Sequence, residues 1–228
     1  LAYNQACFGN GVLLTSFEQR PIGTVQKLLR VQIGGDFTLN SEEERRYAMG
    51  RLGKMPLYIL DHYGNIGFSE IMNNIKYAIR RRDVKLIVVD HLGYLINPEC
   101  SDERREIENC IRQFATLSIQ EGVNIMLICH PNRVWVGQQR RVRITDLKGA
   151  SAIEQDAHCG IVVERVEQDE NNKFPRANIH VDKCRSEFGV AGSTVTLSFD
   201  QMACSFGDSW EDTPSGQKPR SMIINPEA

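Results

Sequence analysis

One stretch, residues 84–95, constrains the fold more than any other part of this sequence. Leu86 to Val89 form an apolar run that is too short for a surface helix and ends abruptly on Asp90. Such a run is typical of a buried parallel strand, and α/β proteins bind ligands at the carboxyl ends of these strands. A carboxylate there can reach a Mg²⁺ ion carried by a nucleotide. The alternative is an Asp90 that only caps the following turn.

Strand-like and helix-like segments alternate from the N-terminus to His130. The expected strands are residues 12–17, 57–60, 84–89 and 124–129, and the expected helices are 1–8, 21–33, 42–52, 69–82 and 102–122. Ser41 and Glu44 have the spacing of a capping box for the third of these helices. This alternation predicts right-handed βαβ crossovers and a mainly parallel sheet with helices on both faces.

The pattern changes after His130. A short helix is expected at residues 150–157, and strands at 161–163, 177–181 and 194–199 are joined by hairpin-like loops. This part is therefore predicted to be antiparallel or mixed. We expect one domain over residues 1–206 and a polar C-terminal tail over residues 207–228.

Composition excludes several classes of protein. With 228 residues, of which 41% are hydrophobic, the chain can bury the core of one large domain. The net charge of −2 means that nucleic-acid binding requires a local basic surface. Seven scattered cysteines without CxxC spacing favour reduced thiols and a reducing compartment. No apolar run approaches the length of a membrane span, so no membrane partner is expected.

Three of the expected strands deliver a chemically active side chain, namely Glu18, Asp90 and His130. If these strands are neighbours, one sheet edge collects a carboxylate that can orient water, a carboxylate that can hold Mg²⁺ and an imidazole that can bind a phosphate. Phosphoryl transfer needs such groups, because its catalysis consists mainly of positioning and charge stabilisation. Taken singly, Glu18 also fits a solvated strand end, and His130 fits a satisfied polar residue beside Pro131.

The loop that follows His130 is basic. It contains Arg133, Arg140, Arg141, Arg143 and Lys148 against a single acid, Asp146. Such a segment can follow the phosphates of single-stranded DNA without reading its sequence. The alternative is a solvated charge run without a specific partner.

Several motifs together resemble a known family. They are Leu-Thr-Ser-Phe-Glu at 14–18, Ile-Val-Val-Asp-His at 87–91, Ser-Asp-Glu-Arg at 101–104, Met-Leu-Ile-Cys-His-Pro at 126–131, Ile-Thr-Asp-Leu-Lys-Gly-Ala-Ser-Ala at 144–152, and Lys-Cys-Arg at 183–185 followed by Gly-Val-Ala-Gly at 189–192. In this order and spacing they resemble the ring-shaped replicative DNA helicases with a RecA-like core. The helicase half of bacteriophage primase-helicases is the nearest resemblance, with mitochondrial Twinkle and the DnaB-like helicases as relatives.

The resemblance covers about residues 11–199 and implies a RecA-like P-loop NTPase core with a C-terminal antiparallel strand extension. The implied activity is translocation of a hexameric or heptameric ring along single-stranded DNA, with unwinding of duplex, driven by hydrolysis of ATP or another NTP or dNTP with Mg²⁺. A primase or polymerase is the implied further partner. The implied location is the cytoplasm of a bacterium or phage-infected host, or the mitochondrial matrix for a Twinkle-like protein.

The resemblance also implies residue roles. Asp90 matches the Walker B aspartate near Mg²⁺, Glu18 the general base, and His130 a γ-phosphate sensor. Arg185 matches an arginine finger that reaches a neighbouring subunit's nucleotide, with Lys183 beside it. The residues implied to sandwich the nucleotide base are Arg165 and Phe199. The residues implied to contact DNA are Arg133, Arg140, Arg141, Arg143, Lys148 and Gly149. Without the resemblance, Lys183 and Arg185 fit the solvent face of a strand, because alternate residues share a side.

The sequence departs from the family in one respect, because it contains no GxxxxGK segment followed by Ser or Thr. We expect that the sequence begins just after this phosphate-binding loop, lacking it and the first strand, and that the chain as written does not hydrolyse nucleotide. Two other functions stay open. One is a RecA- or RadA-type recombinase, and the other is a non-catalytic DNA-binding remnant of the helicase fold.

Overall fold

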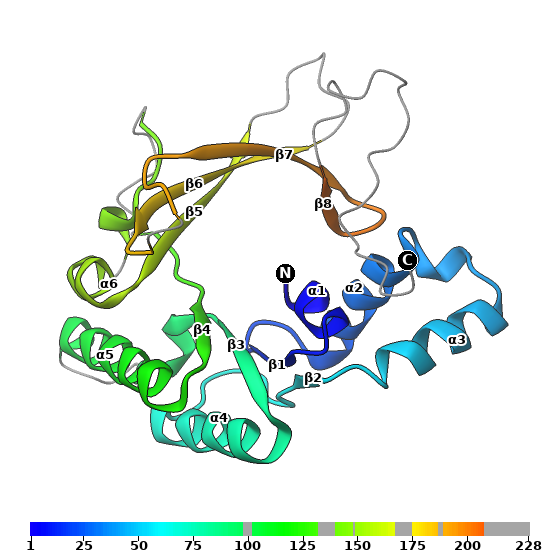
Figure 1. Ribbon diagram of the computed structural model, residues 1–228, viewed down its shortest axis with the longest axis horizontal. Helices are drawn as coiled ribbons and strands as arrows, with labels where there is room; N and C mark the ends of the chain where they lie inside the picture. Colours follow the sequence, from blue (N-terminus) through cyan, green and yellow to red (C-terminus); the bar gives the residue numbers. More distant parts are fainter. Residues whose placement is uncertain (98–101, 132–139, 148, 167–174, 187–188, 208–228) are drawn as a thin grey trace.

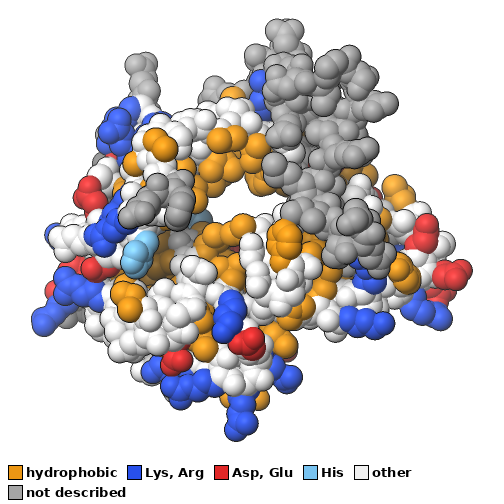
Figure 2. Space-filling view, viewed as in Figure 1, with side chains coloured by type: hydrophobic (Ala, Val, Ile, Leu, Met, Phe, Trp, Pro, Cys, Tyr) orange, Lys and Arg blue, Asp and Glu red, His pale blue; other side chains and the backbone are white. Residues whose placement is uncertain are grey.

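The computed structural model of the chain describes residues 1–97, 102–131, 140–147, 149–166, 175–186 and 189–207 (Figure 1). These residues form two four-stranded sheets, one built from the N-terminal half and one from the C-terminal half. The two sheets face one another, and the space-filling view shows an opening between them (Figure 2). The N-terminus lies beside this opening (Figure 1).

The N-terminal sheet is parallel, as the alternating pattern predicts. Its strands are β1 (Gly11–Ser16), β2 (Leu57–Ile59), β3 (Val84–Asp90) and β4 (Asn124–Leu127), and they lie in the order β2-β1-β3-β4. The strand β4 is two residues shorter than expected. The chain nevertheless stays beside β3, because the amide of Ile128 donates to the carbonyl of Val89 at 2.9 Å.

Helices cover both faces of this sheet, as predicted. The helices α4 (Phe68–Arg82) and α5 (Glu103–Glu121) lie on one face, where they bury a continuous core. The short helix α1 (Ala2–Cys7) lies on the other face, where Ala6 packs against Val12 and Leu86. Adjacent residues of a strand point to opposite faces, which explains why a continuous apolar run is needed in β3.

A second helical unit extends from the sheet and consists of α2 (Pro21–Ile33), the 3₁₀ turn η1 (Phe37–Leu39) and α3 (Glu42–Leu52). Gly34 ends α2 in the left-handed conformation, with φ of 73°. The predicted capping box of α3 is present, because the side chains of Ser41 and Glu44 each accept from the other residue's amide. The helix α3 packs against α2 and projects away from the sheets (Figure 1).

The C-terminal half begins with the 3₁₀ turn η4 (Ile144–Asp146) and α6 (Ala150–Asp156). Its antiparallel sheet contains β5 (Cys159–Val166), β6 (Arg176–Cys184), β7 (Thr194–Asp200) and β8 (Ser205–Gly207), in that order. The antiparallel prediction is confirmed, but β8 was not predicted. Gly207, which the sequence assigned to the tail, ends β8, and residues 208–228 lie outside the described part.

One face of the antiparallel sheet is apolar and exposed. Ile161 is 51% exposed, Val163 62% and Val195 55%. Antiparallel pairing aligns Val163 with Ile179 and Ile179 with Val195, so these side chains share a face. Apolar side chains of this sheet line its side of the opening in the space-filling view (Figure 2).

The strands β4 and β5 are each the last strand at one edge of their sheet. Within the described residues, β4 pairs only with β3, and β5 pairs only with β6. The described cysteines are all free thiols. None of the described helices combines the length and the apolar character that crossing a membrane requires.

Candidate active site

The parallel sheet brings the ends of β1, β3 and β4 to one edge. Ser16, the last residue of β1, is in register with Asp90, the last residue of β3. The amide of Phe17 donates to the carbonyl of Asp90 at 2.8 Å, so Glu18 leaves the sheet directly beside Asp90. His130 follows β4, which is the next strand along. The structure therefore brings Glu18, Asp90 and His130 to the same edge, as the strand pattern predicts.

The carboxylate of Asp90 is paired with the hydroxyl of Ser16. The hydroxyl of Ser16 donates to Oδ2 of Asp90 at 3.2 Å, and both side chains are half-buried. A carboxylate and a hydroxyl are donors that suit Mg²⁺, which binds through few protein groups and substrate phosphates. Ser16 was not among the predicted site residues. Its place two residues before Glu18, at the end of a strand pattern, was the available signal.

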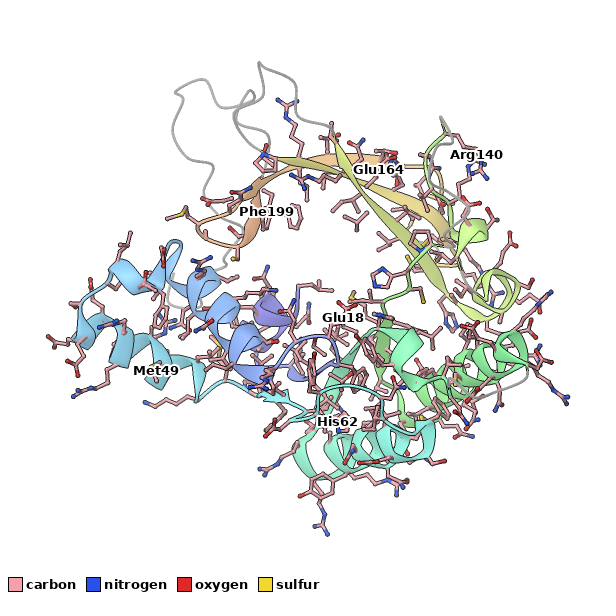
Figure 3. The ribbon with its side chains drawn as sticks, turned by 180° about the vertical axis from the view of Figure 1, so that it is seen from behind. Glu18, Met49, His62, Arg140, Glu164 and Phe199 are labelled. Atoms are coloured by element: carbon pink, nitrogen blue, oxygen red, sulfur yellow. The ribbon has the colours of Figure 1, made fainter. Side chains whose placement is uncertain are left out.

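Glu18 lies at the edge that faces the opening (Figure 3), and its carboxylate is close to two imidazoles. Its Oε1 is 3.1 Å from Nε2 of His91 and 3.8 Å from Nε2 of His130. The two rings contact edge to face, with centroids 4.4 Å apart and planes at 86°. His91 was quoted in a motif but was not predicted as a site residue.

His91 is the N-cap of the 3₁₀ turn η2 (Leu92–Leu95), and its Nδ1 accepts a hydrogen bond of 3.0 Å from the amide of Gly93. Burial, together with the neighbouring His130, lowers the pKa of His91, and the charges of Glu18 and Asp90 oppose this shift only in part. A neutral ring that accepts at Nδ1 carries its proton on Nε2. The hydrogen-bond partners therefore assign Nε2–H as the donor to Glu18.

Cys129 precedes His130 but does not supply a reactive thiolate. Burial raises the pKa of its thiol to about 11. A thiol with this pKa stays protonated at neutral pH, and only the thiolate is a good nucleophile. The chemistry of this edge is therefore that of carboxylates and imidazoles.

The family model of the DnaB-like helicase C terminal domain matches residues 15–208, which contain this entire site. The chain belongs to the DnaB-like helicase family. The resemblance drawn from the sequence motifs is thereby confirmed, and the family is that of a helicase rather than of a recombinase.

Curated relatives agree with this membership. A protein of Enterobacteria phage T3 named "DNA helicase/primase" is 23% identical over 202 residues, covering 81% of this chain and 35% of that protein. A protein of Mycoplasma genitalium named "Replicative DNA helicase DnaB" is 24% identical over 212 residues, covering 86% of this chain and 44% of that protein. The DnaB-like chain thus spans less than half the length of these relatives.

Solved structures show the same fold. One structure, described as an ATPase domain, superposes with a TM-score of 0.76 at 18% identity, covering 91% of this chain and 78% of that one. A structure of a DnaB-like replicative helicase with its primase interactions gives 0.78 at 19% identity, covering 91% and 54% of the respective chains. The expected RecA-like α/β fold, with its parallel sheet and antiparallel extension, is confirmed.

Lys183 and Arg185 of the DnaB-like chain lie on the antiparallel half. Their side chains donate to the carbonyls of Glu154 and Gln155, in the last turn of α6. Cations at a helix C-terminus bind carbonyls that have no partner within the helix. Burial and the nearby Arg185 lower the pKa of Lys183. Neither side chain is brought to Glu18 within this protomer, so the arginine-finger role remains a prediction about a neighbouring subunit.

Arg165 and Phe199 share one face of the antiparallel sheet. The register aligns Arg165 with Ala177 and Ala177 with Leu197, and Phe199 follows Leu197 by two residues. This face is turned toward the opening (Figure 3). Phe199 packs on Phe206 of β8 with ring centroids 4.9 Å apart. Their proposed contact with a nucleotide base stays a prediction.

Two of the predicted DNA-binding cations, Arg140 and Arg141, are held by acids of this chain. Arg140 binds Asp146 through two hydrogen bonds of 3.0 Å, and Arg141 binds Asp182 at 2.7 Å. Arg140 points outward, away from Glu18 (Figure 3). Arg143 is exposed. The remaining candidates Arg133 and Lys148 lie outside the described residues.

Gly149, the last predicted DNA contact, has a clear structural role. It precedes α6 with φ of 74°, and an added Cβ would lie 2.2 Å from Cγ2 of Ile107 in α5. The position therefore requires glycine both for its backbone conformation and for close packing of α6 on α5.

Proposed function

We propose that this DnaB-like chain supplies the water-activating and Mg²⁺-holding side of a nucleotide hydrolysis site in a replicative DNA helicase. The observation that carries the proposal is the convergence of Glu18, Asp90 and His130 at one edge of the parallel sheet. Glu18 lies 3.8 Å from His130, and Asp90 is joined to β1 through Ser16. Such an edge is where α/β sheets bind ligands.

Glu18 acts as the base in the proposed reaction. Its carboxylate accepts a proton from a water molecule while the water oxygen bonds to the γ-phosphorus and the bond to the leaving oxygen breaks. His130 donates a hydrogen bond to a γ-phosphate oxygen, and Asp90 with Ser16 would hold Mg²⁺, which neutralises phosphate charge when bound. Catalysis then depends on positioning and on charge stabilisation.

The site is completed by a neighbouring subunit in the proposed assembly. Arg185, with Lys183 beside it, reaches the γ-phosphate of the adjacent subunit's nucleotide in a hexameric or heptameric ring. An arginine finger supplied in trans contributes about 10³ to 10⁵ in rate. Hydrolysis drives translocation along single-stranded DNA, which the basic segment around Arg143 contacts. ATP or another NTP or dNTP is the substrate, and a primase or polymerase is a further partner.

The decisive experiment replaces Glu18 with Gln in the full-length protein and measures hydrolysis of nucleotide with and without DNA. The expected result is loss of DNA-stimulated hydrolysis by about 10²- to 10⁴-fold, the usual contribution of a general base, with nucleotide affinity retained. The control is Glu70→Gln, an exposed carboxylate in the first turn of α4. Hydrolysis by Glu18→Gln at the rate of the control would refute the role of Glu18.

A further inference from the structure

We infer that His91 is a positioning residue that orients the carboxylate of Glu18 through a neutral Nε2–H donor. The inference rests on the proposed function, because His91 affects hydrolysis only if Glu18 is the base. Nε2 of His91 lies 3.1 Å from Oε1 of Glu18, a shorter distance than the 3.8 Å from Nε2 of His130. His91 is therefore the closer imidazole partner of the base.

The backbone of η2 fixes which nitrogen of His91 is the donor. The amide of Gly93 donates to Nδ1 at 3.0 Å, so Nδ1 uses its lone pair on the backbone. A neutral imidazole with one accepting nitrogen donates from the other. A chain of two hydrogen bonds thus runs from the Gly93 amide to Nδ1 of His91, and from Nε2–H of His91 to the carboxylate of Glu18. In a histidine ring, the hydrogen bond made by one nitrogen determines whether the other nitrogen carries a proton.

Packing holds the ring in this orientation. The side chain of His91 is 19% exposed, and its ring centroid lies 4.9 Å from that of Tyr94 and 4.4 Å from that of His130. A Cβ on Gly93 would lie 2.7 Å from Cε1 and 3.0 Å from Nδ1 of His91. The ring therefore occupies the space that the missing side chain of Gly93 leaves.

The same hydrogen bond argues against a transition-metal site. Glu18, His91 and His130 place one ligand atom each within 4.8 Å of one another, a spacing that two imidazoles and a carboxylate could use around a cation. Metal binding through Nε2 of His91 would require its lone pair there and a proton on Nδ1. That proton would point at the Gly93 amide, so the arrangement favours a hydrogen-bonded carboxylate over a metal ion.

The kinetic test compares three replacements of His91 in the complete gene product. His91→Gln keeps an N–H donor near the Nε2 position, whereas His91→Asn places its amide near Nδ1 and His91→Leu has no polar group. We expect kcat to fall about 10- to 100-fold in the Asn and Leu variants, as for a misplaced catalytic group, with KM for nucleotide changed less than about threefold. His91→Gln should recover most of kcat.

Two further variants separate positioning from general damage. Gly93→Ala keeps His91 but displaces its ring, so it should lower kcat as His91→Leu does. His62→Leu is the matched control, because His62 contacts the carbonyl of Asn65 and not Glu18. Equal kcat values in the Gln, Asn and Leu variants of His91, or wild-type kcat in His91→Leu, would overturn the inference.

A spectroscopic measurement distinguishes failure of this inference from failure of the proposed function. In the protein with ¹⁵N-labelled histidine, two-bond ¹H–¹⁵N correlations should give the Nε2–H tautomer for His91, and Zn²⁺ should leave this signal in place. An Nδ1–H tautomer, or Zn²⁺ bound by His91, overturns the inference whether or not nucleotide is hydrolysed. A wild-type protein without hydrolysis but with the Nε2–H tautomer would refute the function and leave the hydrogen-bond chain standing.

Discussion

Arg140 donates two hydrogen bonds of 3.0 Å to the two carboxylate oxygens of Asp146, six residues along the chain. Asp146, only 8% exposed, also accepts from the amide of Arg143 at 2.8 Å. One carboxylate thus fastens the end of the basic segment to the turn η4. Bidentate pairs of this kind add geometric specificity as well as energy.

This arrangement predicts an acid-sensitive stability. The hydrogen bonds from Arg140 hold the pKa of Asp146 below its ordinary value of 3.8, so their stabilisation is present above that value and is lost as pH falls below it. Asp146→Asn should lower Tm at neutral pH and flatten the dependence of Tm on pH below about 4. Circular dichroism melts measure both effects. Asp61→Asn, at an exposed site, is the control, and parallel curves for Asp146→Asn and wild type would contradict the prediction.

Gly149→Ala should destabilise the protein. The left-handed φ of 74° and the approach of a Cβ to Ile107 together predict a loss of about 2–4 kcal/mol in the free energy of unfolding. Urea unfolding gives the value. Ile107→Leu removes Cγ2. The double variant Gly149→Ala with Ile107→Leu should therefore recover the part of the stability loss that comes from the clash with Ile107. Gly50→Ala, where an added Cβ meets nothing within 4 Å, should instead be neutral or stabilising.

Ser41→Ala should loosen α3 alone. The substitution removes the capping box and should cost about 1 kcal/mol of local stability. Because α3 packs on α2 and projects from the sheets, hydrogen exchange in residues 45–52 should quicken about fivefold while exchange in α4 stays unchanged. Ser69→Ala is the control, since α4 has no side-chain cap hydrogen bond. Equal exchange in both variants would show that the cap contributes nothing.

Arg185→Ala should abolish DNA-stimulated hydrolysis in the complete gene product and leave nucleotide binding intact. A shared site makes a stricter prediction for mixtures. Subunits with Arg185→Ala keep Glu18, and subunits with Glu18→Gln keep Arg185. A mixed interface therefore contains a complete site when the first kind supplies Glu18 and the second kind supplies Arg185. Mixing the two inactive proteins should therefore restore part of the hydrolysis. If the mixtures stay inactive although co-assembly is verified, Arg185 is not part of the site.

The salt dependence of binding to single-stranded DNA should become weaker when Arg143 is replaced. Arg140 and Arg141 are occupied by Asp146 and Asp182, whereas Arg143 is exposed. Loss of one phosphate contact should reduce the slope of log affinity against log salt by about 0.7 on single-stranded DNA. Fluorescence anisotropy at several salt concentrations measures the slope for Arg143→Ala. Arg46→Ala, on α3, is the control, and equal slopes would place DNA contact elsewhere.

Much of the fold was readable from the sequence because local signals and tertiary packing agree. The apolar run before Asp90 became a central parallel strand, and the Ser41 and Glu44 pair became a capping box. Once parallel pairing was predicted, the convergence of Glu18, Asp90 and His130 followed from strand ends meeting at one edge.

The remaining contacts depend on loops that no periodicity describes. The bond between His91 and Glu18 joins residues 73 positions apart through the turn η2, and Arg141 meets Asp182 across 41 positions. The sequence around each of these residues gives no indication of its distant partner. The strand β8 was missed because three residues beside a turn give too short a pattern to recognise.

The edges of β4 and β5 that have no strand partner in the described part should make the protein prone to self-association. Each strand presents a row of backbone N–H and C=O groups without a strand partner in the described part, and β5 also carries the exposed apolar side chains of Ile161 and Val163. Such edges are templates on which any extended segment, including one from another copy, can add as a strand. The protein should therefore self-associate as concentration rises, and an extended peptide that pairs with the edge of β4 or β5 should suppress that association.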